Sequence, residues 1–194
     1  MNGGRGRIEV ITGVMFSGKT EELIRRVRRA LIAGRRVQLF KSHLDDRYGG
    51  RFFVSSHNGS QVSAEPVSKS EQLAEKVQRE TDVVAFDEVQ FLDDGICAVA
   101  TALADAGVRV ILSGTDMDFR GEPFGSIGEL LTRAERIDKL SAICLVCGGR
   151  ATRNQRLIGG EPAPADGPVV LVAGTGSYEA RCRSCHVVPE PTRS

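Results

Sequence analysis

Short apolar runs alternate with longer amphipathic segments over the first two thirds of the chain. Four apolar runs are predicted to be strands, at residues 8–12, 37–40, 83–86 and 108–112. Three helices are predicted between or beside them, at residues 20–33, 70–80 and 94–106. Continuous Val, Ile and Leu runs separated by helices indicate a parallel sheet that is covered on both faces. We therefore expect an α/β domain over residues 1–140.

Two positions mark where these helices are expected to begin and end. Gly34 follows the first predicted helix and is expected to close it, because glycine readily adopts the left-handed conformation of a C-terminal cap. Ser70 opens the second predicted helix and is a candidate N-cap.

The character of the chain changes at Ser141. The remaining residues, 141–194, contain cysteine pairs, two Gly-Gly steps and a stretch rich in Pro and Gly at 161–168. Little of this segment can form a hydrophobic core by itself, so it needs a covalent or metal staple. We predict a small second domain here. No internal repeat is present.

Composition narrows the class of protein. The chain has 194 residues, of which 41% are hydrophobic and 26% charged, as in ordinary globular proteins. The formal net charge of +1 gives no argument for a nucleic-acid or membrane partner. No apolar run approaches the ~18 residues that a membrane helix needs, and no apolar signal core follows residues 1–7. The sequence predicts a cytoplasmic protein.

Four of the five cysteines form two Cys-x-x-Cys pairs. In a reducing compartment such pairs favour metal binding over a disulfide. Two matched pairs favour a closed structural zinc site over a redox site, because four thiolates suit tetrahedral Zn²⁺. The expected ligands are Cys144, Cys147, Cys182 and Cys185.

Two neighbouring features are interpreted without a role at that site. His186 directly follows the last cysteine and is a possible competing ligand, but we interpret it as a bystander. Cys97 stands alone in an Ala-rich amphipathic stretch, where a buried core thiol is the expected role.

A phosphate-binding loop follows the first predicted strand. The pattern G-x-x-x-x-G-K-[ST] needs its glycines so that the backbone N–H groups can point at phosphate oxygens. The lysine reaches the terminal phosphates, and the hydroxyl binds Mg²⁺. A Gly-rich turn is the alternative, but the position between a strand and a helix is what the mechanism demands. The loop consists of Gly13, Val14, Met15, Phe16, Ser17, Gly18, Lys19 and Thr20.

An acidic pair ends the third predicted strand. Asp87 is the candidate for orienting Mg²⁺, and Glu88 beside it is the candidate general base. A simple acidic turn at the end of a strand is the alternative. The phosphate loop favours the functional interpretation.

Two weaker features leave alternatives open. Four arginines of the first helix (Arg25, Arg26, Arg28 and Arg29) are interpreted as a solvated face or a subunit contact rather than a nucleic-acid surface. Three aromatic residues lie in segments rich in Gly, Asp and Pro, where a ring packs on a flat ligand or forms a satellite core. These are Phe119, Phe124 and Tyr178.

Several longer motifs belong together with these features. They are the Met-Phe-Ser-Gly-Lys centre of the phosphate loop, Asp45–Tyr48, Ser56–Gly59, Asp87–Phe91, Asp118–Gly125, both cysteine pairs and Ser177–Cys182. With them the chain resembles the zinc-containing, cytosolic class of thymidine kinases over nearly its whole length. The resemblance implies a RecA-like P-loop domain with a parallel sheet and a small C-terminal zinc-ribbon domain.

The resemblance also implies roles for individual residues. Glu88 takes the proton of the nucleoside 5′-hydroxyl, and Asp87 positions Mg²⁺ through water. The nucleotide and Mg²⁺ contacts include, besides the phosphate loop and this pair, Asp45, Asp46, Arg47, Val89 and Gln90. The thymine pocket and its closing loop take Met15, Phe91, Phe119, Phe124, Val169, Val170, Leu171, Val172, Ala173 and Tyr178.

The activity implied is transfer of the ATP γ-phosphoryl group to the 5′-oxygen of thymidine or deoxyuridine. The family further implies a homotetramer and feedback inhibition by dTTP. Two departures stand out: Val14 replaces a usual proline, which we expect to loosen the loop, and Thr115 replaces a leucine near the base 5-methyl group.

Two rivals remain. A DNA-dependent ATPase uses a similar acidic pair, although the length of one domain counts against a motor. A zinc-ribbon binding module with a vestigial ATP site is the other.

Overall fold

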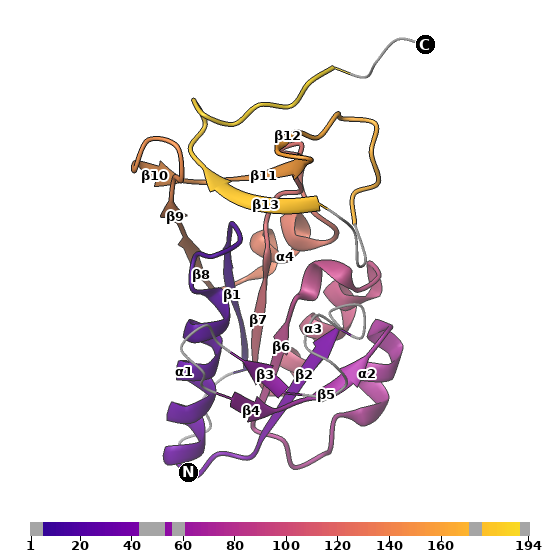
Figure 1. The fold of residues 1–194 in the computed structure, drawn as a ribbon. Coiled ribbons are helices and arrows are strands. Elements are labelled where there is room, and N and C mark those ends of the chain that lie inside the picture. Colours follow the sequence, from indigo (N-terminus) through magenta and orange to yellow (C-terminus); the bar gives the residue numbers. More distant parts are fainter. Residues whose placement is uncertain (1–5, 43–52, 56–60, 171–175, 191–194) are drawn as a thin grey trace.

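A parallel six-stranded sheet forms the centre of the molecule. The computed structural model describes residues 6–42, 53–55, 61–170 and 176–190. The strand order is β5-β2-β6-β7-β1-β8, and every neighbouring pair is parallel (Figure 1). The strands are β1 (Arg7–Gly13), β2 (Val37–Ser42), β5 (Glu65–Val67), β6 (Val83–Asp87), β7 (Arg109–Thr115) and β8 (Arg136–Leu140). The four predicted strands are confirmed as β1, β2, β6 and β7, whereas the two edge strands were not predicted.

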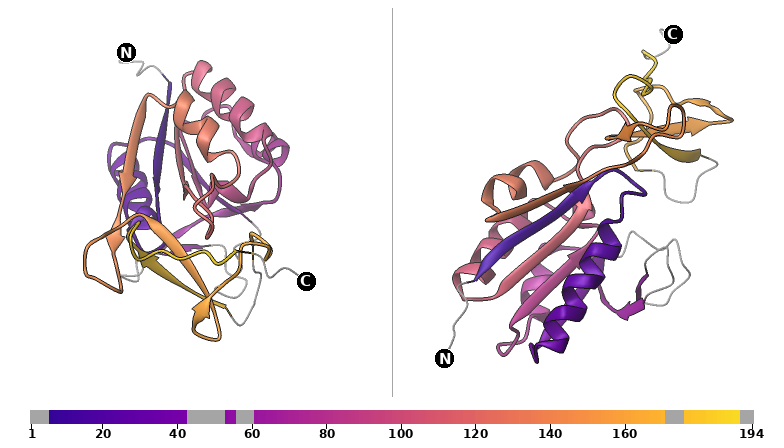
Figure 2. Two further views of the ribbon diagram at one scale, coloured as in Figure 1. Left: turned by 90° about the horizontal axis from the view of Figure 1, so that it is seen from above. Right: turned by 90° about the vertical axis from the view of Figure 1, so that its left-hand side faces the viewer.

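Helices cover both faces of this sheet, as the apolar strands require. Helix α1 (Lys19–Ile32) packs on one face, where Leu23 and Val27 meet Ile11 and Ala85. The opposite face carries α2 (Ser70–Lys76), α3 (Gly95–Asp105) and α4 (Ile127–Arg133). Figure 2 shows the sheet between these two layers.

The helix ends agree with prediction at one place and differ at another. Gly34 has φ +71° and its N–H bonds the Leu31 carbonyl, so the expected glycine closure of α1 is confirmed. Ser70 is not an N-cap: Lys69 holds that position, and the Ser70 hydroxyl donates to Asp93.

Helix α2 is also shorter than predicted. It ends at Lys76 instead of continuing to residue 80. The side chain of Gln38 on β2 accounts for this difference, since it bonds the Lys76 carbonyl, the Gln78 N–H and the Thr81 hydroxyl. These bonds satisfy backbone groups that a longer helix would have paired.

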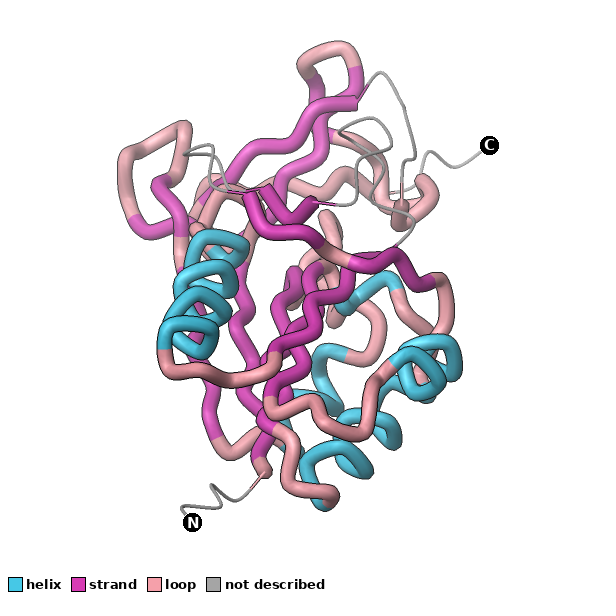
Figure 3. Tube along the Cα trace, turned by 90° about the horizontal axis from the view of Figure 1, so that it is seen from below, coloured by secondary structure: helices cyan, strands magenta, loops and turns pink. Residues whose placement is uncertain are grey.

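A short antiparallel pair, β3 (Phe53–Ser55) with β4 (Gln61–Ser63), lies beside α1 (Figure 3). This pair forms a separate two-stranded sheet and is not part of the six-stranded sheet.

A second unit, built from short strands, sits above the end of the sheet where β1 leads into the phosphate loop (Figure 1). It contains the hairpin β9 (Ala142–Ile143) and β10 (Arg150–Ala151). A three-stranded sheet of order β12-β11-β13 completes it, with β11 (Arg153–Ile158), β12 (Glu161–Pro162) and β13 (Gly176–Arg181). We call residues 141–190 the ribbon unit.

The ribbon unit shares a small core with the phosphate loop. Val14 is 1% exposed and packs in one cluster with Cys144, Ala151 and Ala180. The packing of Val14 against the ribbon unit anchors the phosphate loop at this position, and the expected loosening relative to proline stays a prediction.

One arginine of α1 differs from its expected role. Arg26 was grouped with a solvated face but is 3% exposed, and it forms ion pairs with Glu9, Glu22 and Asp138. Cys97, by contrast, is 3% exposed in the core as predicted, where burial raises the pKa of its thiol to about 11. None of the helices among the described residues has the length and apolarity to cross a membrane.

Candidate active site

The loop between β1 and α1 adopts the shape of a phosphate cradle. Gly13 has φ +141°, and a Cβ there would lie 2.3 Å from the Leu140 carbonyl oxygen. Gly18 has φ +86° and directly precedes α1. Phe16 also has a positive φ of 63° and exposes its ring at the loop. Glycine is thus required at two of the positions that define the motif.

The polar groups of the loop fit an anion. The Lys19 ammonium is buried and donates to the Val14 carbonyl at 2.9 Å, so the charge folds back over the loop. The buried hydroxyl oxygen of Ser17 has no hydrogen-bond partner within the described part of the chain. Together with the N-terminal N–H groups of α1, these donors suit phosphate oxygens.

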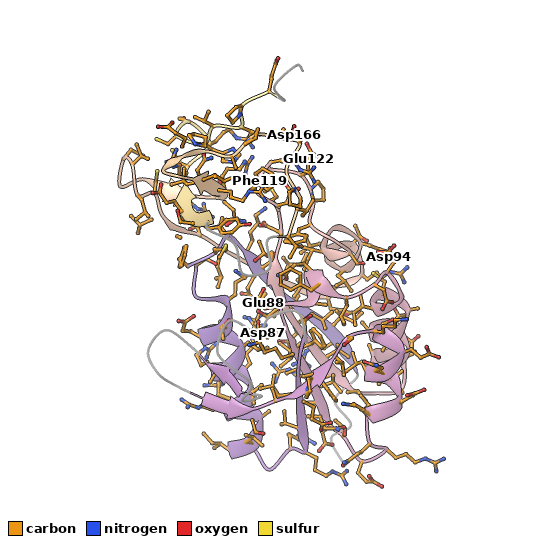
Figure 4. All side chains as sticks on the ribbon, turned by 45° about the vertical axis from the view of Figure 1, so that its right-hand side comes forward. Asp87, Glu88, Asp94, Phe119, Glu122 and Asp166 are labelled. Atoms are coloured by element: carbon orange, nitrogen blue, oxygen red, sulfur yellow. The ribbon has the colours of Figure 1, made fainter. Side chains whose placement is uncertain are left out.

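The phosphate loop touches the acidic pair. The Thr20 hydroxyl donates to Asp87 Oδ2 at 3.0 Å. Asp87 is the last residue of β6 and is 4% exposed, and the labelled side chains of Asp87 and Glu88 lie next to each other in Figure 4. A hydroxyl and a carboxylate beside a phosphate cradle are the donor set that Mg²⁺ prefers.

The Asp87 carboxyl is strongly perturbed. Burial, followed by the nearby charge of Glu88, raises its pKa to about 6, although the hydrogen bond from Thr20 and the charge of Lys19 act in the opposite direction. A divalent cation beside this carboxylate favours its ionised form. The site therefore fits the metal that ATP brings.

Glu88 is held in a strained conformation by its neighbours. Its φ of 59° lies in the left-handed region, which is uncommon for glutamate and clusters at functional sites. The Gln90 amide nitrogen donates to Glu88 Oε2 at 2.5 Å, and the Gln90 amide oxygen accepts the Thr115 N–H at 3.0 Å. Gln90 thereby ties Glu88 to the end of β7. Val89 between them points into the hydrophobic core.

The aromatic residues expected around the base fall into two groups. Phe91 and Phe124 form an edge-to-face pair with ring centroids 5.5 Å apart. Phe119 is 2% exposed and packs under the guanidinium of Arg156. Tyr178 lies in strand β13 opposite Arg156 rather than in a loop, which corrects the expectation from composition.

Two ribbon residues reach the site in roles that no sequence pattern indicated. Asn154 on β11 accepts the Met15 N–H and donates to the Met117 carbonyl, both at 2.8 Å. His186 bonds the Phe119 carbonyl through Nε2 at 2.8 Å. Each of these contacts joins parts of the chain that are more than 30 residues apart. A short sequence motif could therefore not reveal them.

The four cysteines come together as predicted. Their sulfur atoms all lie within 4.8 Å of one another, and the Cys147 and Cys182 sulfurs are 3.7 Å apart. Four sulfurs at ~2.3 Å from one Zn²⁺ are about 3.8 Å apart, so the cluster fits a tetrahedral zinc ion. His186 is not part of this group, in agreement with its interpretation as a bystander.

Some predicted site residues cannot be placed. Asp45, Asp46, Arg47, Leu171, Val172 and Ala173 lie outside the described residues. Val169 and Val170 are described, and both follow the turn after β12, with Val170 partly exposed.

The parallel sheet, the phosphate loop and the acidic pair at the end of β6 define a P-loop nucleotide-binding protein. The family model for thymidine kinase matches residues 6–186. The chain belongs to the thymidine kinase family, and its general activity is the phosphorylation of thymidine.

Solved structures show more distant similarity. Domain III of the replication initiation protein DnaA from Thermotoga maritima is 18% identical, with a TM-score of 0.44 over 71% of this chain and 55% of that one. The flagellar accessory protein FlaH from Methanocaldococcus jannaschii is 14% identical, with a TM-score of 0.49 over 76% of each chain.

Proposed function

We propose that this chain transfers the γ-phosphoryl group of ATP to the 5′-hydroxyl of thymidine and deoxyuridine, giving the 5′-monophosphate and ADP for nucleotide salvage. The observation that carries the proposal is the contact between Thr20 of the phosphate loop and Asp87, with Glu88 as the next residue. This contact brings a phosphate cradle, a metal-binding carboxylate and a second carboxylate into one site.

Each group has a separate role. The phosphate loop binds the β- and γ-phosphates through its N–H groups, and Lys19 neutralises their charge. Thr20 and Asp87 would hold the Mg²⁺ of the nucleotide, which would screen the phosphate charge. Glu88 accepts the proton of the 5′-hydroxyl as the bond from the 5′-oxygen to phosphorus forms and the bond to ADP breaks. The protein thus contributes alignment and charge neutralisation.

The nucleoside is proposed to bind between the end of the main sheet and the ribbon unit. Met15, Phe91, Phe119, Phe124 and Tyr178 come from both sides of this boundary, and residues 169–173 close over the base. Met15 joins the two, because its N–H is bonded to Asn154 of the ribbon unit. Thr115 at the end of β7 faces this region in the proposal and sets tolerance at the base 5-position.

Further properties complete the proposal. Residues 1–140 form the kinase domain and residues 141–194 a zinc-ribbon domain, whose Zn²⁺ is structural. We also propose a homotetramer in the cytoplasm, inhibited by dTTP.

A nucleoside panel tests this proposal. With ATP and Mg²⁺, thymidine and deoxyuridine should each yield a product heavier by one phosphoryl group, while deoxycytidine and purine nucleosides should react ~10⁴-fold more slowly. A pocket that hydrogen-bonds one base edge leaves buried groups unpaired when the donor pattern changes. Comparable turnover of deoxycytidine would show the substrate assignment to be wrong.

The same assay separates the rival class. A DNA-dependent ATPase hydrolyses ATP when single-stranded DNA is added and no nucleoside is present. A binding module with a vestigial ATP site would consume no ATP, either with a nucleoside or with single-stranded DNA.

A further inference from the structure

Arg156 is the largest fully buried side chain among the residues that the structure describes. It lies on β11 of the ribbon unit and is 1% exposed. Its Nη1 donates to the Pro168 carbonyl, whereas Nε and Nη2 have no hydrogen-bond partner within the described residues. A guanidinium stays charged at any physiological pH. This is therefore a buried cation with two unused donor groups.

The guanidinium of Arg156 faces an aromatic ring instead of a carboxylate. The guanidinium carbon lies 3.5 Å from the centroid of the Phe119 ring, in a cation–π contact. Within the described part of the chain, Arg156 makes no ion pair, while Arg120, Arg153 and Arg181 nearby bond polar groups within two residues of themselves. Phe119 precedes the ribbon unit in the chain and Arg156 belongs to that unit, so the contact joins the two parts of the molecule.

Arg156 also fixes the turn that leads to the predicted closing loop. Besides the bond to Pro168, its Nη2 lies against Gly167: a Cβ at Gly167 would be 2.3 Å from that nitrogen. A side chain at residue 167 would therefore have to displace the end of the Arg156 side chain. One guanidinium holds the Phe119 ring on one side and residues 167–168 on the other.

Burial of Arg156 in this arrangement lowers the stability of the folded state. Burying an unpaired charge costs free energy, and apolar residues of similar size often serve stability as well or better. A residue kept for stability alone would not be an unpaired arginine. Its geometry instead fits the positioning of two segments relative to each other.

We propose that Arg156 is a positioning residue for the nucleoside, which locks the Phe119 ring and the 167–168 turn into one wall of the base pocket. The inference rests on the proposed function, because it takes Phe119 as part of that pocket. It assigns to the ribbon unit a direct part in nucleoside affinity, through a residue with no role in phosphoryl transfer.

Arg156→Met tests the proposal, since methionine keeps the apolar stem and removes the planar cation. We expect the KM for thymidine to rise about tenfold or more, as misplaced binding groups commonly cause. The kcat and the KM for ATP should stay within about threefold. The melting temperature should not fall, because the unpaired buried charge is gone. Arg156→Lys should restore little, since an ammonium cannot stack as a guanidinium does.

Gly167→Ala provides a second test that leaves the arginine in place. The new methyl group must displace Nη2, so the thymidine KM should rise here as well, without a loss of kcat. The Gly167→Ala variant also keeps the proposal testable if Arg156→Met fails to fold. Matched controls are Arg150→Met, an exposed arginine of the ribbon unit, and Gly128→Ala, where an added Cβ meets nothing within 4 Å.

The outcomes separate this inference from the proposed function. If the unchanged protein phosphorylates no thymidine, the proposed function fails before any variant is measured. If it is active and both variants keep the thymidine KM within twofold, the positioning role is overturned. A KM increase in Arg156→Met that comes with a melting temperature lower by about 5 °C or more, and with no KM change in Gly167→Ala, shows a merely structural arginine. Faster amide exchange at residues 165–167 in Arg156→Met supports the positioning role independently of activity.

Discussion

At the scale of single residues, the site depends on side chains that fix other side chains. Glu88 occupies a left-handed conformation at the end of β6, and the Gln90 amide holds its carboxylate. A carboxylate with several rotatable bonds loses entropy when it is held in one place, and here that loss occurs on folding rather than during the reaction. The proposed base is thus ready before substrate binds.

Glu88→Gln tests the role of this carboxylate. Glutamine keeps the shape but accepts no proton, so kcat should fall ~10²–10⁴-fold with little change in either KM. Single-turnover rates measured by product mass report the chemical step. Glu80→Gln, an exposed change on the surface, is the control. A rate within a few-fold of the parent, with chemistry limiting, would show that Glu88 is not the base.

Asp87→Asn should behave differently from Glu88→Gln. The Thr20 hydroxyl keeps a hydrogen-bond partner, but the charge that attracts Mg²⁺ is lost. We expect a lower rate together with a Mg²⁺ requirement raised about tenfold or more. Titration of activity against Mg²⁺ measures this, and an unchanged midpoint would remove Asp87 from the metal site.

At the scale of elements, a buried ion network joins α1 to three strands. Glu9 on β1 is fully buried and pairs with Arg7, with Arg26 of α1 and with Arg109 of β7. Burial alone would raise the pKa of Glu9, but the hydrogen bonds and charges of Arg109 and Arg7 outweigh it and lower the pKa to about 2. Arg26 extends the network to Asp138 on β8.

This network predicts how stability depends on pH. The folded pKa of Glu9 lies below its unfolded value of about 4.5, so its contribution is complete above pH ~4.5 and disappears as the pH falls towards 2. The contribution is about 3 kcal/mol by linkage. Denaturant unfolding between pH 2 and 7 should show this loss, and Glu9→Gln should flatten it. Equal slopes in Glu9→Gln and the exposed control Glu75→Gln would contradict the assignment.

The ribbon unit carries the four-cysteine cluster on a small hydrophobic core. Among the described residues, the core that it shares with the phosphate loop contains four buried residues, one of which is Val14. A structural metal supplies folding free energy directly to such a small unit.

Cys182→Ser should remove this support. We expect the loss of about one Zn²⁺ per chain by elemental analysis, a melting temperature lower by ~10 °C, and weaker thymidine binding. Ser184→Ala, an exposed change between the two cysteines, should leave all three unchanged. Active protein without metal would refute the structural role of zinc.

At the scale of the whole molecule, the sequence predicted those features that depend on short stretches of the chain. The central strands, the phosphate loop and the cysteine cluster were predicted because each depends on residues close in sequence or on one recognisable spacing. The edge strands β5 and β8 are short and half polar, so their sequences gave little signal. Arg26, Asn154 and Arg156 were missed or misassigned because the partners that decide their roles lie far away along the chain: Asp138 for Arg26, Met15 for Asn154 and Phe119 for Arg156.

Val14 and the Asn154 bridge have a consequence for how this protein can be divided. The Val14 side chain of the phosphate loop packs in the core of the ribbon unit, and the Met15 N–H donates to the side-chain oxygen of Asn154. An isolated fragment ending near residue 140 would keep the whole nucleotide motif, yet it would expose Val14 and leave that N–H to water. The ribbon unit is therefore not an independent module: its exchange for the ribbon of a relative would change the support of the phosphate loop, even though no ribbon residue belongs to the motif itself.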